Sequence, residues 1–459
     1  MNIIIIHAHD AGRAVQPYGF PVHTPNISAI AEEGVFFKEA FCAAPTCSPS
    51  RAAMLTGLYP HEVNMIGLAH RGFALSPVEK HLSSRLKDLN YSTALAGIQH
   101  EVPDWEMLRY DEYIGKDPEA SLSPGFEPLD WDSSIAEALT EWIQGKDPHE
   151  PPFYLFWGLF EPHRPFPVAD RPFEDKRFPL YGLPDTDELR TDLAGYKRGV
   201  EHTDLLIGKV LKALKDQGLY HDSLIIVTTD HGIAFPGYKC TLSDRGTGVE
   251  LMIRFPEDLA IEGIKNSIVI EEPVSHLDII PTIHELLGVD DKSLRGKSLI
   301  SLIKDDCLDS PFHEYLFSEI TYHAAYEPVR AIRSSAFKLI RRFTKYPFLP
   351  SNIDNSPAKI ELLGEESESG LFEFSQNTNE FDQYEDLLYD LQTDPDEEMN
   401  LLVGDQLDNK TQEVYHTLVE ALESWMVDTH DPLCSGTVSP PEGALVSRSD
   451  AYSPKGLYR

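Results

Sequence analysis

Residues 2–8 read NIIIIHA, a run of β-branched residues that ends in polar ones. Four adjacent isoleucines are typical of a strand buried on both faces, as in the centre of a parallel sheet. In open parallel sheets, ligands bind at the carboxyl ends of the strands. His9 and Asp10 follow this run directly, so they are predicted to lie where a functional site is expected.

The same alternation of hydrophobic runs and helical patterns continues to about residue 303. Further strands are predicted at 35–39, 92–97, 153–159 and 223–229. Helices are predicted at 26–33, from about 50, at 82–89, 133–144 and 191–217, with a βα-type region at 277–287 and 299–303. This order predicts an α/β fold with a large, mostly parallel sheet flanked by helices.

The pattern changes after residue 312. Short extended runs at 315–318, 329–332 and 338–342 are followed by an acidic stretch, 351–385, that we expect to be an irregular surface insertion. Residues 387–391 are expected to return to ordered structure, an amphipathic helix is predicted at 411–427, and the last 20 or so residues are expected to be loosely structured. We therefore expect a catalytic α/β domain at 1–312 and a smaller α+β domain at 313–459.

The composition excludes several classes of partner. Among 459 residues, 39 are Lys or Arg and 75 are Asp or Glu, which gives a net charge of −36. Such a surface repels nucleic acid and anionic membranes. We find no signal-peptide pattern and no apolar run of about 18 residues, and five scattered cysteines suit a reducing compartment. The prediction is a cytoplasmic protein without nucleic-acid or membrane partners.

Residues 47–57 read CSPSRAAMLTG and form the second informative segment. Pro49 disfavours the helical region for the residue before it, so a helix is expected to begin near residue 50. Cys47 would then lie just ahead of a helix N-terminus, where free N–H groups and the helix dipole favour an anion. Arg51 adds a planar cation there. A buried structural thiol is the alternative interpretation of Cys47.

Two pairs of polar residues directly follow predicted buried strands. His9-Asp10 follows the run at 2–8, and Asp230-His231 follows the run at 223–229. Unpaired polar groups at such positions are costly, and a divalent metal would satisfy them. Because neighbouring strand ends converge, both pairs are predicted to face one ion. A hydrogen-bonded loop and a capped turn are the alternatives.

Three further basic residues lie in loops after strands. His163 lies between Pro162 and Pro165, which would hold its imidazole in a rigid loop suited to proton transfer. His100 and Lys239 are less distinctive, and solvated loop residues are the alternative for both. Together with a metal and a nucleophile at a helix start, these groups match the needs of sulfuryl or phosphoryl transfer.

These motifs resemble the type I (formylglycine-dependent) sulfatases of the alkaline-phosphatase superfamily. The resemblance covers nearly the whole chain and is carried by CSPSR (47–51), TDHG (229–232) and LYDL (388–391). A closer likeness to the heparan N-sulfatase (sulfamidase) branch is carried by EPHR (161–164), GIAFP (232–236) and THDP (429–432). The resemblance implies an alkaline-phosphatase-like fold and hydrolysis of a small sulfate ester or sulfamate, expected on a sugar.

The resemblance also implies catalytic roles. Cys47 would be oxidised by a formylglycine-generating maturation enzyme, and the hydrate of the resulting aldehyde would attack sulfur. Arg51 would steady the hydrate, and His100 would help to deprotonate it and expel sulfate. His163 and Lys239 would bind the sulfate group and protonate the leaving oxygen or nitrogen.

Asp10, Asp230 and His231 match the family's ligands for one divalent metal, usually calcium or magnesium. His9 stands where the family has a second aspartate. A nitrogen ligand suits calcium less well than manganese or zinc, so His9 either changes the metal preference or lies outside the coordination shell.

Two other positions depart from the family pattern. Ile98 replaces a sulfate-binding lysine, and Ser243-Asp244 replace the usual Tyr-Glu pair. Two other functions therefore stay open: a phosphonate monoester or phosphodiester hydrolase of the same superfamily, and a catalytically silent, sulfate-binding homologue.

Overall fold

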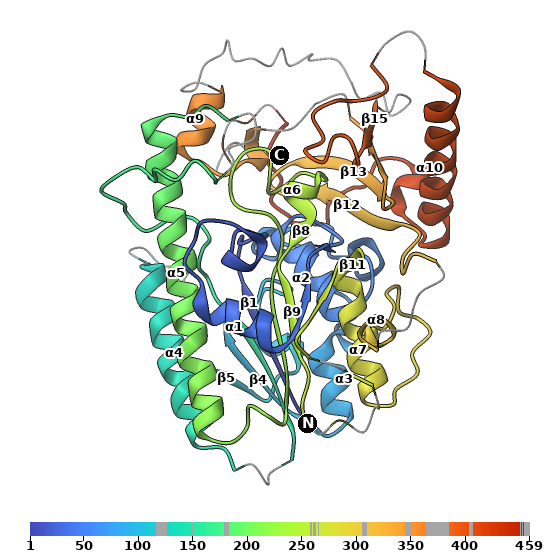
Figure 1. Cartoon of the computed structure of the whole chain (residues 1–459). Coiled ribbons are helices and arrows are strands. Elements are labelled where there is room, and N and C mark those ends of the chain that lie inside the picture. Colours follow the sequence, from blue (N-terminus) through green and yellow to red (C-terminus); the bar gives the residue numbers. More distant parts are fainter. Residues whose placement is uncertain are drawn as a thin grey trace.

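The computed structural model describes residues 1–459 except 116–125, 148–150, 179–182, 258, 260–262, 265, 305–309, 345–349, 364–384, 404–406, 450, 452 and 454–459. In this part of the chain, eight strands form one central sheet in the order β10-β2-β9-β7-β1-β6-β4-β5 (Figure 1). β1 lies inside the sheet and pairs in parallel with β6 and β7. β9 is antiparallel to both of its neighbours, so the sheet is mostly parallel, as predicted. The bounds of these strands are β1 Asn2–Ala8, β2 Val35–Phe37, β4 Ser92–Gly97, β5 Glu112–Ile114, β6 Phe153–Gly158, β7 Ser223–Thr229, β9 Leu251–Arg254 and β10 Ile268–Ile270.

Helices cover both faces of this sheet. Ile4 and Ile6 of β1 belong to a hydrophobic cluster with α1, α4 and α5, whereas Ile3 and Ile5 belong to another with α2, α3 and α7. Successive side chains of a strand point to opposite faces, so the isoleucine run fills both cores. Figure 1 shows α4 and α5 on one side and α3, α7 and α8 on the other. The bounds are α1 Pro25–Glu33, α2 Cys47–Thr56, α3 Leu82–Asp88, α4 Pro128–Gln144, α5 Asp187–Asp216, α6 Asp244–Thr247, α7 Ile279–Leu286 and α8 Ile300–Ile303.

Two smaller sheets complete the described strands. β3 (Ala40–Phe41), β8 (Gly248–Val249) and β11 (Val274–Ser275) form a three-stranded sheet. An antiparallel sheet of four strands, with α10 packed against it, confirms the predicted α+β character of the C-terminal region. The division into two domains at residue 312 stays a prediction. These elements are β12 Leu316–Tyr322, β13 Tyr326–Arg333, β14 Phe337–Arg342, β15 Glu385–Asp390 and α10 Asn409–Asp428.

The expectation of an irregular surface insertion is wrong for the part of 351–385 that the structure describes before β15. A short helical turn at Pro350–Asn352 leads to α9 (Pro357–Leu363). Asn352 and Lys359 are buried, because their side chains hydrogen-bond to backbone groups of neighbouring segments. Residues 364–384 of the predicted insertion lie outside the described residues.

In the described chain, none of the helices combines the length and the apolar character of a membrane span.

Two acidic side chains lie at the carboxyl end of β6. Asp132 of α4 accepts hydrogen bonds from the N–H groups of Phe160 (2.9 Å) and Glu161 (2.8 Å). The Glu161 side chain is buried against α5, where Gly199 leaves room for it: a Cβ there would lie 2.0 Å from Glu161 Oε2. Burial, together with the neighbouring Asp132, raises the pKa of Glu161 to about 9. Glu161 is therefore a neutral acid at pH 7.

Glu161→Gln is expected to weaken the loss of stability with rising pH. The pKa of Glu161 in the folded state, about 9, lies above the ordinary value of 4.5. Between these two pH values the folded state therefore keeps a proton that the unfolded chain has released. The free energy of unfolding therefore falls as pH rises through the window, by up to about 1.4 kcal/mol per unit. Glutamine stays neutral, so the melting temperature of the variant should rise relative to that of the wild type as the pH increases from about 5 to about 9. Glu188→Gln, at an exposed position of α5, is the control, and parallel curves for wild type and Glu161→Gln would contradict the assignment.

Candidate active site

The carboxyl ends of β1 and β7 meet at one edge of the central sheet. Their register pairs Ala8 with Thr229, so the polar residues that follow each strand come together. The N–H of Asp10 donates a hydrogen bond of 2.8 Å to Oδ1 of Asp230. Asp10 has a φ of +60°, a left-handed conformation that a short polar side chain tolerates. The two predicted ligand pairs therefore lie side by side.

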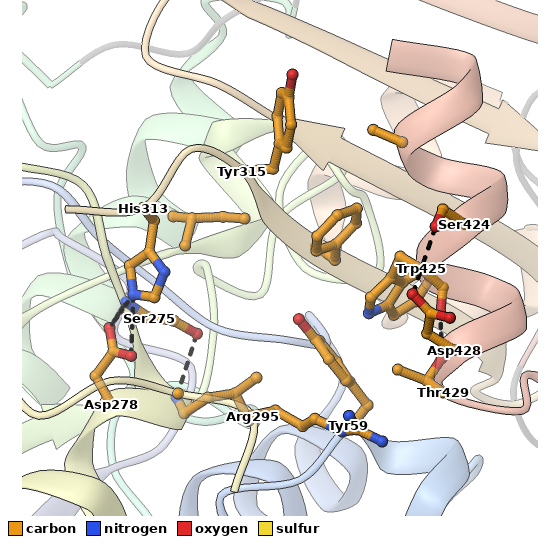
Figure 2. Close-up of a pocket in the computed structure, with 15 residues that line it drawn as sticks. Tyr59, Ser275, Asp278, Arg295, His313, Tyr315, Ser424, Trp425, Asp428 and Thr429 are labelled. Atoms are coloured by element: carbon orange, nitrogen blue, oxygen red, sulfur yellow. Dashed lines mark hydrogen bonds and ion pairs between the residues drawn. The ribbon is translucent and has the colours of Figure 1, made fainter. Parts of the chain in front are cut away.

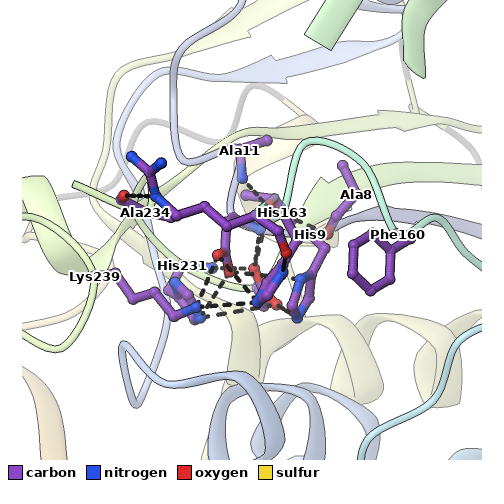
Figure 3. Close-up of polar contacts among 12 residues, drawn as sticks. Ala8, His9, Ala11, Phe160, His163, His231, Ala234 and Lys239 are labelled. Atoms are coloured by element: carbon purple, nitrogen blue, oxygen red, sulfur yellow. Dashed lines mark hydrogen bonds and ion pairs between the residues drawn. The ribbon is translucent and has the colours of Figure 1, made fainter. Parts of the chain in front are cut away.

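Two imidazoles flank these two carboxylates (Figure 3). Nε2 of His231 lies 3.4 Å from Oδ1 of Asp10, and Nε2 of His9 lies 3.2 Å from Oδ2 of Asp230. Nδ1 of His231 donates to the carbonyl of Gly232 (2.9 Å), so the lone pair of its Nε2 faces the carboxylates. All four side chains are fully buried. The structure thus brings together all four of the predicted metal ligands.

This cluster fits a divalent cation. Ligand atoms of Asp10, Asp230, His231 and Cys47 all lie within 4.8 Å of one another, and Asp10 and Cys47 form a second such group with His9 and His163. Oδ1 of Asp10, Oδ2 of Asp230 and Nε2 of His231 have no hydrogen-bond partner among the described residues. Buried anionic oxygens of this kind are costly unless a cation neutralises them. Mixed carboxylate and imidazole donors suit manganese or zinc, and the carboxylates also suit magnesium or calcium.

His9 has the protonation state that a ligand needs. Burial, together with the nearby His163 and Arg51, lowers the pKa of His9 well below its usual value. Its ring lies 4.3 Å from the ring of His163 and 5.1 Å from that of His100, centroid to centroid. His9 therefore lies between the carboxylates and the two histidines predicted to be catalytic.

Cys47 is the first residue of α2, which contradicts the expectation of a helix that begins near residue 50. Proline is tolerated in the first turn of a helix, because the N–H groups there have no intrahelical acceptor. Pro49 therefore lies inside α2 without breaking it. The Cys47 side chain borders a large cleft, and burial raises the pKa of its thiol.

Two side chains of α2 connect it to the end of β7. The hydroxyl of Ser50 donates a hydrogen bond of 2.5 Å to the carbonyl of Asp230. Arg51 is fully buried, with Nη2 at 3.5 Å from Oδ2 of Asp230. Its three guanidinium nitrogens have no hydrogen-bond partner among the described residues. Arg51 is thus a buried cation held next to the cluster with unused donors.

His163 and Lys239 lie on the cleft side of Asp10. Lys239 Nζ donates to Oδ2 of Asp10 (2.8 Å) and lies 3.5 Å from Nε2 of His163. Although burial alone would lower it, the carboxylates of Asp10 and Asp354 raise the pKa of Lys239 well above its usual value. Nδ1 of His163 donates to the carbonyl of Arg164, so its Nε2 lone pair faces Lys239. Both predicted residues therefore border the cleft beside Cys47.

His100 also borders the cleft, beside His9. Burial and the charge of Arg51 lower the pKa of its imidazole well below the usual value. The main-chain N–H of His100 donates to Oε2 of Glu101 (3.0 Å), which fixes the loop. All five residues predicted to be catalytic thus lie next to the cluster of predicted metal ligands.

The departures from the family pattern have structural explanations. Ile98 is 3% exposed and packs in the hydrophobic cluster under α4 and α5, so no cation stands at that position. The hydroxyl of Ser243 accepts from the N–H of Gly246 at the start of α6. Asp244 binds Lys338 (2.6 Å) of β14. Ser243 therefore caps α6, and Asp244 contacts the C-terminal sheet.

Sequence reasoning missed two residues of the site, Asp354 and His323. Oδ2 of Asp354 lies 3.1 Å from Lys239 Nζ, and both side chains border the cleft. Neither residue follows a strand of the central sheet or stands in a recognisable motif. For Asp354 the only signal is its place in the acidic stretch that begins at residue 351, and His323 has no such signal.

The cleft that these residues border has a volume of about 1370 Å³. Apolar side chains, among them Phe126, Phe166 and Val168, also line it. A smaller pocket of about 390 Å³ lies beside α10, where His313 Nε2 is 2.9 Å from Oδ2 of Asp278 (Figure 2). None of the predicted site residues lines that pocket. The large cleft is therefore the candidate active site.

Comparisons with known proteins give the family and the fold of the chain. The model of the Sulfatase family matches residues 1–289. Human N-sulphoglucosamine sulphohydrolase is 27% identical over 491 aligned positions, which cover 97% of this chain and 92% of that protein.

Two solved structures share the fold. One, described as a complex with its substrate D-glucosamine-2-N,6-O-disulfate, aligns with a TM-score of 0.67 at 17% identity, over 94% of this chain and 98% of that one. The phosphonate monoester hydrolase of Agrobacterium radiobacter aligns with a TM-score of 0.70 at 19% identity, over 97% and 99%. At these identities the likeness shows the alkaline-phosphatase-like fold alone. With a family model that matches well over half of its length, the chain belongs to the sulfatase family.

Proposed function

We propose that the protein hydrolyses a small sulfated sugar, as its sulfate ester or sulfamate, with a formylglycine made from Cys47. The observation that carries this proposal is the shared position of Cys47, Lys239 and His163 on one cleft, directly beside the buried carboxylates of Asp10 and Asp230. A nucleophile, a cation and an imidazole are thus within reach of one sulfuryl group. The relatives' activities on sulfated sugars support the choice of substrate.

The residues around the cleft divide the chemistry between them. A divalent cation held by Asp10, Asp230 and His231, with His9 as a fourth ligand, would supply positive charge to the sulfuryl oxygens. Lys239 adds a second cation on the cleft side of that cluster. Its ammonium group is therefore placed to bind a sulfuryl oxygen.

Proton transfer falls to the two cleft histidines. As a hydrated aldehyde, residue 47 would supply the oxygen nucleophile, which Arg51 steadies. His100, 5.1 Å from His9 between ring centroids, would accept the proton of the hydrate's second hydroxyl and so help to expel sulfate and restore the aldehyde. His163, next to Lys239, would protonate the leaving oxygen or nitrogen. The cleft's volume of about 1370 Å³ accommodates a monosaccharide or disaccharide.

One experiment tests this function and its main alternative. The chain is co-expressed with a formylglycine-generating enzyme and assayed with an aryl sulfate, an aryl phosphodiester and a panel of sulfated monosaccharides and disaccharides. Higher kcat/KM on the sulfates supports the proposal. Faster cleavage of the phosphodiester would favour a phosphonate or phosphodiester hydrolase, which the shared fold with the Agrobacterium enzyme makes the second candidate.

Cys47→Ala is expected to lower turnover of the preferred sulfate by more than about a thousandfold, because the nucleophile is lost. The fold should persist, since alanine suits the first turn of α2. Cys434→Ser, at an exposed thiol far along the chain, is the matched control and should keep full activity.

Mass spectrometry of the peptide that contains residue 47 provides the second readout. The active wild-type protein should contain a residue lighter than cysteine by the change from thiol to aldehyde. Full activity with an intact thiol would refute the formylglycine, and an intact thiol with no activity would favour a silent, sulfate-binding protein.

Divalent cations are expected to raise the melting temperature of the chelator-treated protein by a few degrees at saturating concentration. We expect manganese or zinc to stabilise the wild type more than calcium, because His9 offers nitrogen. His9→Asp should reverse this order in favour of calcium. His313→Gln, in the smaller pocket, should keep the wild-type order, and an unchanged order in His9→Asp would place His9 outside the coordination shell.

A further inference from the structure

Asp354 is a charged group of the cleft that the proposed chemistry leaves unused. Its Oδ2 lies 3.1 Å from Nζ of Lys239, and 22% of its side chain is exposed. Lys239 is thereby held between two carboxylates, Asp10 on the metal side and Asp354 on the cleft side. A carboxylate beside a sulfate-binding lysine repels the sulfate, so its presence calls for a compensating role.

The segment around Asp354 is held firmly in place. The side-chain oxygen of Asn352 accepts hydrogen bonds from the N–H groups of Ala324 (2.9 Å) and Ala325 (2.8 Å), in the turn between β12 and β13. Lys359 of α9 donates to the carbonyl of Ile353 (2.9 Å). The carboxylate is therefore preorganised by contacts on both sides of it, as a recognition group requires.

His323 borders the cleft from the same turn. Its side chain is 6% exposed, and its Nδ1 has no hydrogen-bond partner among the described residues. Burial and the charge of Lys239 lower the pKa of His323 well below its usual value, so the ring is neutral. A buried polar atom without a partner at the edge of a cleft indicates a missing ligand group.

The leaving atom of the substrate distinguishes the possible ligand groups. In a sulfate ester the leaving oxygen ends as a neutral hydroxyl group. In a sulfamate the reaction is R–NH–SO₃⁻ + H₂O → R–NH₃⁺ + SO₄²⁻, in which the S–N bond breaks, an S–O bond forms and nitrogen takes both protons of the water. Only the second reaction generates a cation with several N–H donors at the leaving atom. Asp354 contacts Lys239, whose Nζ lies 3.5 Å from Nε2 of His163, the residue proposed to protonate this atom.

We infer that Asp354, assisted by His323, recognises the amino nitrogen of the leaving group and directs the enzyme to N-sulfated amino sugars. This inference rests on the proposed sulfatase function and extends it from the sulfate to the group that departs. The carboxylate binds the N–H of the sulfamate first and the ammonium of the product afterwards. Because charge develops there as the S–N bond breaks, the contact strengthens along the reaction.

The test compares N–S with O–S cleavage in matched variants. Wild type, Asp354→Asn and the control Glu137→Gln, an exposed carboxylate of α4 that does not border the cleft, are assayed with glucosamine N-sulfate and glucose 6-sulfate. Asp354→Asn should lower the ratio of the two kcat/KM values, N-sulfate over O-sulfate, by about ten- to a hundredfold. Glu137→Gln should leave the ratio as in the wild type.

Product binding by the wild type gives a readout that needs no variant. Glucosamine should inhibit at least about tenfold more strongly than N-acetylglucosamine, which has no ammonium group. Equal inhibition by the two sugars, or an equal loss on both substrates in Asp354→Asn, would overturn the inference and leave Asp354 as a counter-ion of Lys239. A wild type that cleaves only O-sulfates would also overturn it while the proposed function stands, whereas a wild type that cleaves neither contradicts the proposed function.

Discussion

The register between β1 and β7 is the constraint on which the site depends. It pairs Ala8 with Thr229, so that Asp10 and Asp230 leave the sheet at the same level and share a hydrogen bond of 2.8 Å. A shift of one residue would turn one carboxylate to the other face of the sheet, since side chains alternate along a strand. The isoleucines of β1 pack in separate hydrophobic clusters on the two faces of the sheet, which holds this strand in its centre.

The rest of the site is arranged around this pair of carboxylates. Ser50 and Arg51 connect α2 to Asp230, which places Cys47 beside the cluster. Lys239 contacts Asp10 from the cleft side. Every one of these groups is buried or nearly so, and charges in such a place require partners of opposite sign. Although the net charge of the chain is −36, the site contains two buried cations, Arg51 and Lys239, next to its carboxylates.

Prediction succeeded where a strand or a motif places a residue. β1, β4, β6 and β7 coincide with hydrophobic runs, and the side chains just beyond β1 and β7 form the cluster of predicted metal ligands. The start of α2 was missed, because the restriction before Pro49 was taken as a helix boundary when the first turn tolerates it. Asp354 was missed as a site residue, since it is separated from Lys239 by 115 positions and no periodicity connects the two.

The order of hydrophobic runs and the polar residues at their ends predicted the parallel sheet and the two pairs of ligand candidates at one of its edges, because local patterning indicates which strands are buried on both faces. The role of Cys47 as nucleophile rests on its motif and stays a prediction. Which other side chains border the cleft was decided only by the tertiary structure. Asp354 and His323 reach the cleft together because Asn352 is hydrogen-bonded to the turn between β12 and β13 and because Asp354 contacts Lys239. Contacts of this kind depend on packing between segments far apart in sequence, and a single sequence has no local signal for them.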